Sequence, residues 1–426
     1  MAIKPKKTRN KAPKIAVILE SSHEVSRAMI RGIFKFARIH GDWRIEIAAG
    51  GPGDLRLPNR QIWRGDGIIG RLPNATVVQQ IVDSRLPFVG VDPPDWCLNT
   101  EHPLAACPGV RCNSKAVGIR AAEYLMNLGF DHYAFVGVLE DTNWSRVRRE
   151  FFVRTLADAN FHCHIYCPPS QKNSRQEYPM PNLPDNDLFL VKERRKLTEW
   201  LKKLPKPIAL FAANDHRARI VLEACADAGI HAPYEIAVLG VNNDELICQT
   251  TFPSLSSIAL SAEEAGYVAA NMMSDLLTGS LSRNSGKTHI FDPQNIVERG
   301  STLSVSVTNP KLIQAIEFIR LNAGLNMQVV DVAKHIGVTR QWAERLFQSE
   351  WNCSVHEEIS KVRLRTIRSM VADTEMTFGE IAQTCGFESA NHLRNLFKKE
   401  YGTTMADYRL DAKRQASLPP ILTPGE

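Results

Sequence analysis

The chain has 426 residues, of which 44% are hydrophobic and 23% are charged; these values are ordinary for globular proteins and predict two or three domains. No apolar run approaches the ~18 residues that a membrane span needs, and no signal-peptide core follows the N-terminus, so we expect a cytoplasmic protein. The formal net charge of +6 comes from a basic tail, which either solubilises the chain or touches phosphates. Its cations are Lys4, Lys6, Lys7, Arg9, Lys11 and Lys14.

Nine cysteines are present without a CxxC pair, which is typical of reduced thiols. The spacing in His162-Cys163-His164 and Cys167 would allow a metal ion. These residues lie in an expected strand, however, where alternate side chains point to opposite faces. We therefore predict neither a metal site nor a cofactor.

The first third of the chain alternates short apolar runs with helical patterns. Strands are expected at 14–20, 43–48, 66–70 and 87–91, and helices at 25–39 and 75–84. A loop rich in Pro and Cys follows at 92–109. Strands alternating with helices of this length predict a doubly wound parallel sheet.

A second alternating series follows. A strand at 110–112 and a helix at 113–128 precede it, and its own expected strands lie at 132–138, 161–167, 207–212 and 236–241, with helices at 143–158, 187–203 and 214–228. A helix at 261–278 and short strands at 288–298 close the region. Two such series predict two lobes, with a ligand crevice lined by the loops at the carboxyl ends of the strands.

The end of the chain contains one pattern twice, at 329–347 and 378–397. Each copy has an Ala, then a Gly four residues later, then an amphipathic segment that ends in Leu-Phe. The Ala lets two helices approach, and the Gly takes a turn geometry that a Cβ opposes. The repeat predicts two helix-turn-helix motifs, preceded by a helix from Pro310 and joined by a long helix at 354–372. Thr377 and Glu380 form an expected capping box.

The exposed side chains of each second helix are the expected readers of DNA bases, because Arg pairs with guanine and Asn or Gln with adenine. We predict this role for Arg340, Gln341, Glu344, Arg345, Ala390, Asn391, Arg394 and Asn395. Lys398, Lys399 and the cations at 361–368 are expected to hold phosphates, which positions a DNA-binding domain without reading sequence.

The segments at 213–246, 252–261 and 296–302 resemble the effector domain of LacI/GalR-type sugar-responsive repressors, which shares its fold with periplasmic sugar-binding proteins. The resemblance covers about 14–302. It implies ligand contacts from the residues Ser26, Arg27, Asn113, Arg149, Asn214, Asp215 and Asn242. Trp144 either stacks on a sugar face or packs its helix.

Two of these positions have a structural alternative. Asp215 begins a helix, where a carboxylate also serves as a cap, and Asn242 is a residue type that favours turns. The sequence also departs from the family, because Cys112 stands where an acid commonly precedes Asn113. The segment at 240–243 likewise reads Gly-Val-Asn-Asn in place of Gly-Phe-Asp-Asp.

The paired motifs resemble the AraC/XylS family of transcription regulators over about 310–410. The matching end pattern runs from Phe397-Lys398-Lys399 through Gly402 to Tyr408-Arg409. Met405 replaces the usual Pro, and Ala343 the usual Leu. Both replacements are apolar, so they affect local packing more than the fold.

A sensor followed by an AraC-type reader resembles the bacterial xylose operon regulators. The resemblance implies a sugar-responsive transcription regulator, an activator of a sugar-use operon for xylose or another monosaccharide, which binds promoter DNA as a homodimer and contacts RNA polymerase. The expected parts are a basic tail at 1–13, a two-lobed α/β sensor at 14–302, a linker at 303–309, an all-α reader at 310–410 and a tail at 411–426.

Two alternatives remain open. One is a regulator whose sensor has lost its ligand. The other is a sugar-modifying enzyme with an appended DNA reader, although the chain has no G-x-S-x-G motif, no P-loop and no G-x-G-x-x-G after a strand.

Overall fold

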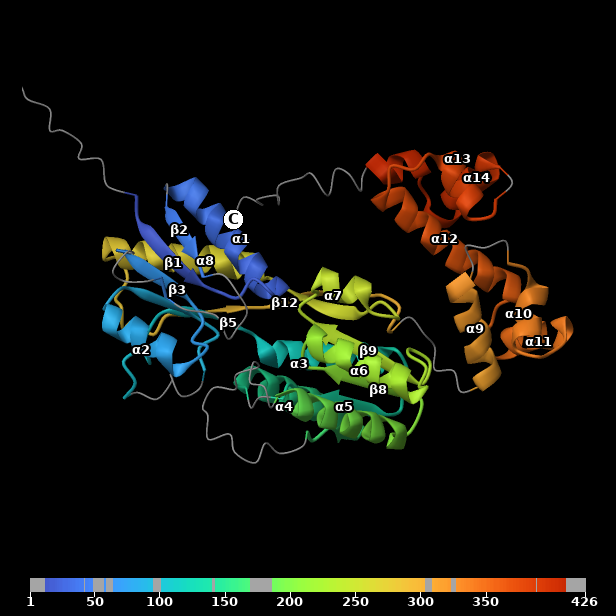
Figure 1. Cartoon of the computed structure of the whole chain (residues 1–426), viewed down its shortest axis with the longest axis horizontal. Coiled ribbons are helices and arrows are strands. Elements are labelled where there is room, and N and C mark those ends of the chain that lie inside the picture. The colour runs from blue at the N-terminus through green and yellow to red at the C-terminus, as the bar shows by residue number, and fades with distance from the viewer. Residues whose placement is uncertain are drawn as a thin grey trace, which may run out of the picture. The chain divides into compact units, whose positions relative to one another are not determined.

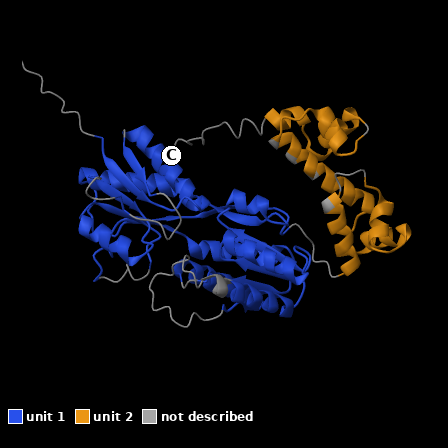
Figure 2. Ribbon diagram, viewed as in Figure 1, with its two compact units in different colours: residues 1–306 blue, residues 307–426 orange. Residues whose placement is uncertain are grey.

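The computed structural model describes residues 12–41, 43–48, 57–58, 64–94, 101–139, 142–168, 186–302, 309–322, 327–387 and 389–410. The chain divides into two compact units: unit 1 comprises residues 1–306 and unit 2 comprises residues 307–426 (Figure 2). The predicted tail at 411–426, most of the predicted tail at 1–13 and most of the predicted linker lie outside the described residues.

The first lobe of unit 1 is a six-stranded parallel sheet in the order β11-β5-β4-β3-β1-β2 (Figure 1). Its strands are β1 (Lys14–Ile18), β2 (Arg44–Ile47), β3 (Gly67–Gly70), β4 (Phe88–Val91), β5 (Gly109–Cys112) and β11 (Thr288–Phe291). Its helices are α1 (Glu24–His40), α2 (Ala75–Ser84) and α8 (Ala262–Thr278).

Helices α1 and α8 approach each other closely at two glycines. A Cβ on Gly32 would lie 1.9 Å from the carbonyl oxygen of Glu263, and a Cβ on Gly266 would lie 2.0 Å from that of Met29. Only glycine fits at either point. The two helices, which are over 200 residues apart in the sequence, thereby share one core. Ile15, Val17 and neighbouring buried residues belong to the same core.

The second lobe has the sheet order β12-β10-β9-β8-β6-β7, parallel except where β12 pairs antiparallel with β10. Its strands are β6 (Tyr133–Val136), β7 (Cys163–Ile165), β8 (Ile208–Ala212), β9 (Ile236–Val241), β10 (Ser256–Leu260) and β12 (Pro293–Val297). Its helices are α3 (Ser114–Asn127), α4 (Asn143–Asp158), α5 (Asn186–Lys203), α6 (Asp215–Ala228) and α7 (Glu245–Thr250).

The chain crosses between the lobes three times, after β5, after β10 and between β11 and β12. The doubly wound fold predicted from the alternation is confirmed. The closing helix and strands do not stay together, however: α8 and β11 return to the first lobe, whereas β12 completes the second.

Strand β10 was not among the expected elements, because its sequence SSIAL begins with two serines. Ser256 and Ser257 are fully buried, which their hydrogen bonds allow. The Oγ of Ser256 accepts from the amide of Arg299 at 2.7 Å, and the Oγ of Ser257 donates to Asp215 at 2.6 Å.

Unit 2 is helical throughout its described secondary structure. It comprises α9 (Pro310–Asn322), α10 (Val329–His335), α11 (Arg340–Glu350), α12 (Val355–Asp373), α13 (Phe378–Thr384) and α14 (Ala390–Tyr401). Gly337 and Gly386 have φ of 64° and 72° at the turns after α10 and α13, as the repeated pattern predicted. The capping box of Thr377 and Glu380 is present. Among the described residues, no helix is long and apolar enough to span a membrane.

Candidate functional site

Polar and charged side chains gather where the carboxyl ends of the strands of the two lobes meet. We call this group the interlobe cluster. Its members come from both lobes, and the contacts among them lie partly within one lobe and partly between the two lobes. The cluster consists of Glu20, His23, Arg27, Arg71, Asp92, Cys112, Trp144, Arg148, Asp215, His216 and Asp244.

Arg27 connects the two lobes directly. Its Nη2 lies 3.2 Å from Oδ2 of Asp244, which is 5% exposed, and its Nε donates to Glu24 at 3.0 Å. The backbone amide of Glu24 also donates to Asp244, at 3.0 Å. The N-terminus of α1 in the first lobe is therefore tied to the loop after β9 in the second.

Asp215 is fully buried and holds together the ends of three strands of the second lobe. Its Oδ1 accepts from Ser257 at 2.6 Å, and its Oδ2 accepts from the amide of Asp244 at 2.7 Å. Burial raises the pKa of Asp215 to about 7, although these two hydrogen bonds oppose the rise. Both carboxylate oxygens are already engaged with the protein, so this arrangement favours a structural role.

Glu20, which is 4% exposed, and Arg71, which is 28% exposed, form an ion pair at the carboxyl end of the first sheet. Burial alone would raise the pKa of Glu20, but the Arg71 charge and a hydrogen bond with His23 outweigh it and lower that pKa to about 2. Arg71 also lies 3.6 Å from Asp92. Arg71 is therefore matched by two carboxylates.

His23 and His216 bring the lobes together at a second point, with ring centroids 4.7 Å apart and edge-on. Burial and the neighbouring His23 lower the pKa of His216 to about 4, so His216 is neutral at pH 7. Its buried Nε2 has no hydrogen-bond partner among the described residues.

Arg148 reaches across from α4 to the first lobe and is 4% exposed. Its Nη1 donates to the carbonyl oxygen of Ala213 at 2.5 Å, and its Nη2 lies 3.6 Å from Sγ of Cys112. The guanidinium carbon lies 4.8 Å from the centroid of the Trp144 ring. Trp144 thus packs against Arg148 of its own helix, and its stacking on a sugar face stays a prediction.

The remaining predicted ligand residues lie around this cluster in different settings. Ser26 is buried in α1. Asn113 and Asn214 are helix N-caps that accept from the amides of Ala116 and Arg217. Asn242 has φ of 110°, which supports its reading as a turn residue.

Arg149 is exposed on the outer face of α4, where it borders an open depression with Arg146 and Ile165. The structure does not bring it into the interlobe cluster. Its neighbour Arg148 occupies the inward position that the resemblance had assigned to Arg149. A helical signal was available, because the buried residues of α4 are Ser145, Arg148, Phe152 and Leu156, spaced by three or four.

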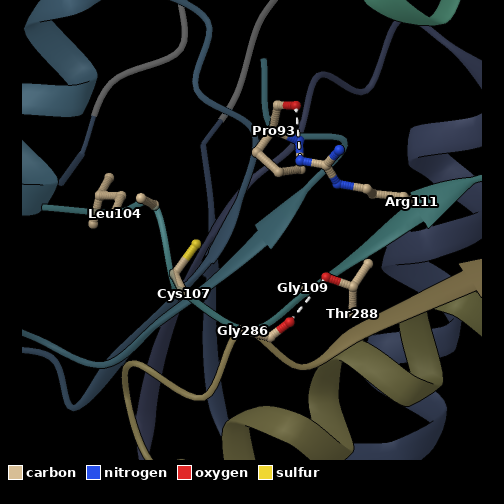
Figure 3. A pocket seen from close by; sticks show the side chains of 8 residues that line it. Pro93, Leu104, Cys107, Gly109, Arg111, Gly286 and Thr288 are labelled. Atoms are coloured by element: carbon tan, nitrogen blue, oxygen red, sulfur yellow. Dashed lines mark hydrogen bonds between the residues drawn. The ribbon is translucent and has the colours of Figure 1, made fainter. Parts of the chain in front are cut away.

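A separate cavity of about 280 Å³ lies elsewhere on the first lobe. Figure 3 shows Arg111 directed toward Pro93, with the two 3.5 Å apart between Nη2 and the carbonyl oxygen. Gly109 and Thr288, which also line it, are the first residues of β5 and β11. The cavity thus runs beside β5 and β11 from their first residues to Arg111 and Pro93, which adjoin the cluster residues Cys112 and Asp92 in the sequence.

In unit 2, the second helix of each motif presents a polar face. The predicted readers that are exposed on these helices are Arg340, Gln341, Arg345, Asn391, Arg394 and Asn395, together with Lys398 and Lys399. The apolar face is inward, with Ala343, Phe347, Leu393 and Phe397 fully buried. Arg394 donates to Asn391 at 3.2 Å, so these two side chains hold each other on the exposed face.

Two predicted readers are placed differently. Glu344 is half-buried, and its Oε2 accepts from the amide of Val355 at 3.2 Å, at the first residue of α12. This contact stabilises the start of α12, where a carboxylate is favourable. Ala390 is half-buried and packs against the core of the second motif.

Trp342 was not among the predicted readers. It is 41% exposed on the first turn of α11, two residues after Arg340. A large apolar side chain exposed on a recognition helix is suited to contact with the thymine methyl group. Its spacing within the helix was visible in the sequence, but tryptophan is usually assigned to the core.

Comparisons with known proteins agree with this arrangement. Residues 122–302 match the periplasmic binding protein-like domain, and residues 332–411 match a helix-turn-helix domain. The xylose operon regulatory protein of Haemophilus influenzae is 31% identical over 81% of this chain and 85% of its own length. That of Escherichia coli strain K12 is 27% identical over 94% and 97%.

A solved structure, of a xylose-binding transcription activator, has a TM-score of 0.77 and 25% identity over 94% of this chain and 99% of its own. The lac repressor dimer bound to operator has a TM-score of 0.50 and 15% identity over 70% and 96%, a likeness of fold alone. These matches confirm the order of sensor and AraC-type reader. The chain belongs to the family of the xylose operon regulatory proteins and is a DNA-binding transcription regulator.

Proposed function

We propose that this regulator binds a monosaccharide at the interlobe cluster and that the bound sugar controls how unit 2 holds promoter DNA. The observation that carries the proposal is a set of buried nitrogen atoms without hydrogen-bond partners among the described residues: Arg71 Nε, Arg148 Nε and His216 Nε2. Buried polar atoms are normally paired. Sugar hydroxyl groups both donate and accept, so they suit the two donors and the neutral imidazole nitrogen.

The relatives support the ligand class. Their names refer to a xylose operon, and the structurally similar activator is described as xylose-binding. We infer that the effector here is xylose or another monosaccharide. Arg148, Arg71 and His216 are the residues we expect to contact it, and Asp215 is expected to keep the surrounding loops in place.

Control requires a ligand that binds two arrangements of the lobes with unequal affinity. The Arg27–Asp244 ion pair crosses between the lobes, so it is broken or reformed by any change in their separation. We propose that the regulator acts in the cytoplasm as a homodimer, which presents four recognition helices to successive major grooves. We further propose that the sugar-bound dimer contacts RNA polymerase and activates transcription.

A thermal-shift screen of the full-length protein against pentoses, hexoses and their aldonates and uronates tests the sensor. A ligand present at 100 times its Kd adds about 2.7 kcal/mol of stability. The matched pair of variants is Arg148→Ala, which should remove the shift, and Arg149→Ala, which should keep it. A complete panel without any shift would favour the ligand-independent regulator. If Arg149→Ala removes the shift and Arg148→Ala does not, Arg149 contacts the ligand and Arg148 does not.

A further inference from the structure

The interlobe cluster contains three arginines, and they differ in how their charges are balanced. Arg27 is paired with Glu24 and Asp244. Arg71 is paired with Glu20 and lies near Asp92. Arg148 has no carboxylate partner among the described residues, although it is the most deeply buried of the three.

The contacts of Arg148 do not supply a negative charge. They are a backbone carbonyl at 2.5 Å, a thiol at 3.6 Å and an aromatic ring at 4.8 Å. Burial raises the pKa of the Cys112 thiol, and the opposing effect of Arg148 does not reverse this, so the thiol is neutral at pH 7. A buried charge that lacks a partner is costly.

The free donor of this guanidinium is its Nε, which is buried and has no hydrogen-bond partner in the part of the chain that the structure describes. Nε and an adjacent terminal nitrogen form one edge of the planar fork, and that edge matches the two oxygens of a carboxylate. A singly charged group is sufficient for that edge, because Arg148 is the one arginine of the cluster without an ion pair among the described residues. A phosphate carries nearly two negative charges at pH 7, and the other two arginines of the cluster, Arg27 and Arg71, each already lie against two carboxylates.

From the missing ion pair and the unpartnered Nε of Arg148 we infer that the effector is an acidic monosaccharide, an aldonate or uronate, whose carboxylate pairs with Arg148. This inference rests on the proposed sugar-sensing function and narrows it. The remaining hydroxyl groups of such a ligand would meet Arg71 Nε and His216 Nε2. Cys112 is the residue that selects for charge, because an acid at this position would itself neutralise Arg148.

The test measures Kd by titration calorimetry for D-xylose, D-glucose, D-xylonate, D-glucuronate, D-galacturonate and D-glucose 6-phosphate with the full-length protein. We expect at least one of the three sugar acids to bind at least tenfold more tightly than every neutral sugar and the phosphate. A charge-assisted hydrogen-bond pair of this kind changes affinity by about 10-fold or more.

Two variants at one position separate charge from shape. Cys112→Asp places a carboxylate beside Arg148 and should weaken binding of the sugar acid at least tenfold, whereas Cys112→Asn, which has the same size without the charge, should change it less than threefold. Thermal unfolding checks that both variants fold.

Preferred binding of a neutral sugar would overturn the inference and leave the sugar sensor standing. Preferred binding of the sugar phosphate, or equal effects of the two Cys112 variants on acid binding, would overturn it as well. Binding of no compound in the panel would overturn both the inference and the proposed function.

Discussion

Removing the Asp215 carboxylate should destabilise unit 1, whether or not a ligand is present. Asp215→Ala leaves the Ser257 hydroxyl and the Asp244 amide without the acceptors that now lie 2.6 and 2.7 Å away. Each buried donor left unpaired costs about 1–3 kcal/mol, so the free energy of unfolding should fall by about 2–6 kcal/mol. At roughly 2–4 °C per kcal/mol for a domain of this size class, Tm should fall by at least about 4 °C.

The unfolding free energy lost in Asp215→Ala should depend on pH, because burial raises the pKa of the native carboxyl group. The pKa of Asp215 is raised from 3.8 to about 7, so the folded state binds a proton that the unfolded state has released between these values. The stability that this carboxyl contributes therefore falls as pH rises from about 4 to about 7. The difference in unfolding free energy between the native protein and Asp215→Ala should therefore be larger at pH 5.5 than at pH 8.

Calorimetric unfolding at both pH values measures the two effects. The control is Asp227→Ala on the same helix, where the carboxylate is 50% exposed and paired with Arg194; an exposed pair contributes about 1 kcal/mol or less. If Asp215→Ala unfolds at the native temperature but no longer binds sugar, Asp215 is a ligand contact and the structural assignment is wrong.

Four further substitutions test other parts of the structure. Gly240→Ala should lower the stability of unit 1 by about 1–3 kcal/mol in denaturant titration, because its Cβ would lie 2.3 Å from Oδ1 of Asp215; a native midpoint would contradict the tight packing. Arg394→Ala should weaken specific promoter binding about tenfold in fluorescence anisotropy without changing Tm, and Trp342→Ala should do the same to a smaller extent. Glu344→Ala should instead lower the Tm of unit 2, because it removes the acceptor for the Val355 amide; unchanged Tm with weakened binding would make Glu344 a base reader.

The DNA-binding unit was the part most fully predictable from sequence. Its signals are local: Gly337 and Gly386 set the turns, and Thr377 with Glu380 marks a helix start. The assignment of side chains to the buried or exposed face followed from helical spacing, and the burial of Leu393 confirms it. The prediction missed the contact of Glu344 with α12, the partial burial of Ala390 and the exposure of Trp342.

The sensor was less predictable, because its arrangement depends on contacts between distant segments. Nothing local indicates that α8 returns to the first lobe, since that follows from its packing on α1 through Gly32 and Gly266. The pairing of Asp215 with Ser257 likewise requires the neighbouring β9 and β10 strands to be in place. The choice between Arg148 and Arg149 could have been made from the sequence. The apolar positions of α4 recur every three or four residues, and this spacing places Arg148 on the buried face.

The most direct test of the central claim is the affinity of the full-length protein for its own promoter, measured with and without the sugar that the binding screen identifies. In the native protein, saturating sugar should change the promoter Kd at least tenfold, which corresponds to a coupling free energy of about 1.4 kcal/mol. In Arg148→Ala the promoter Kd should be the same with and without sugar. A sugar that binds tightly to the native protein and leaves its promoter Kd unchanged would contradict the claim that the interlobe cluster controls DNA binding.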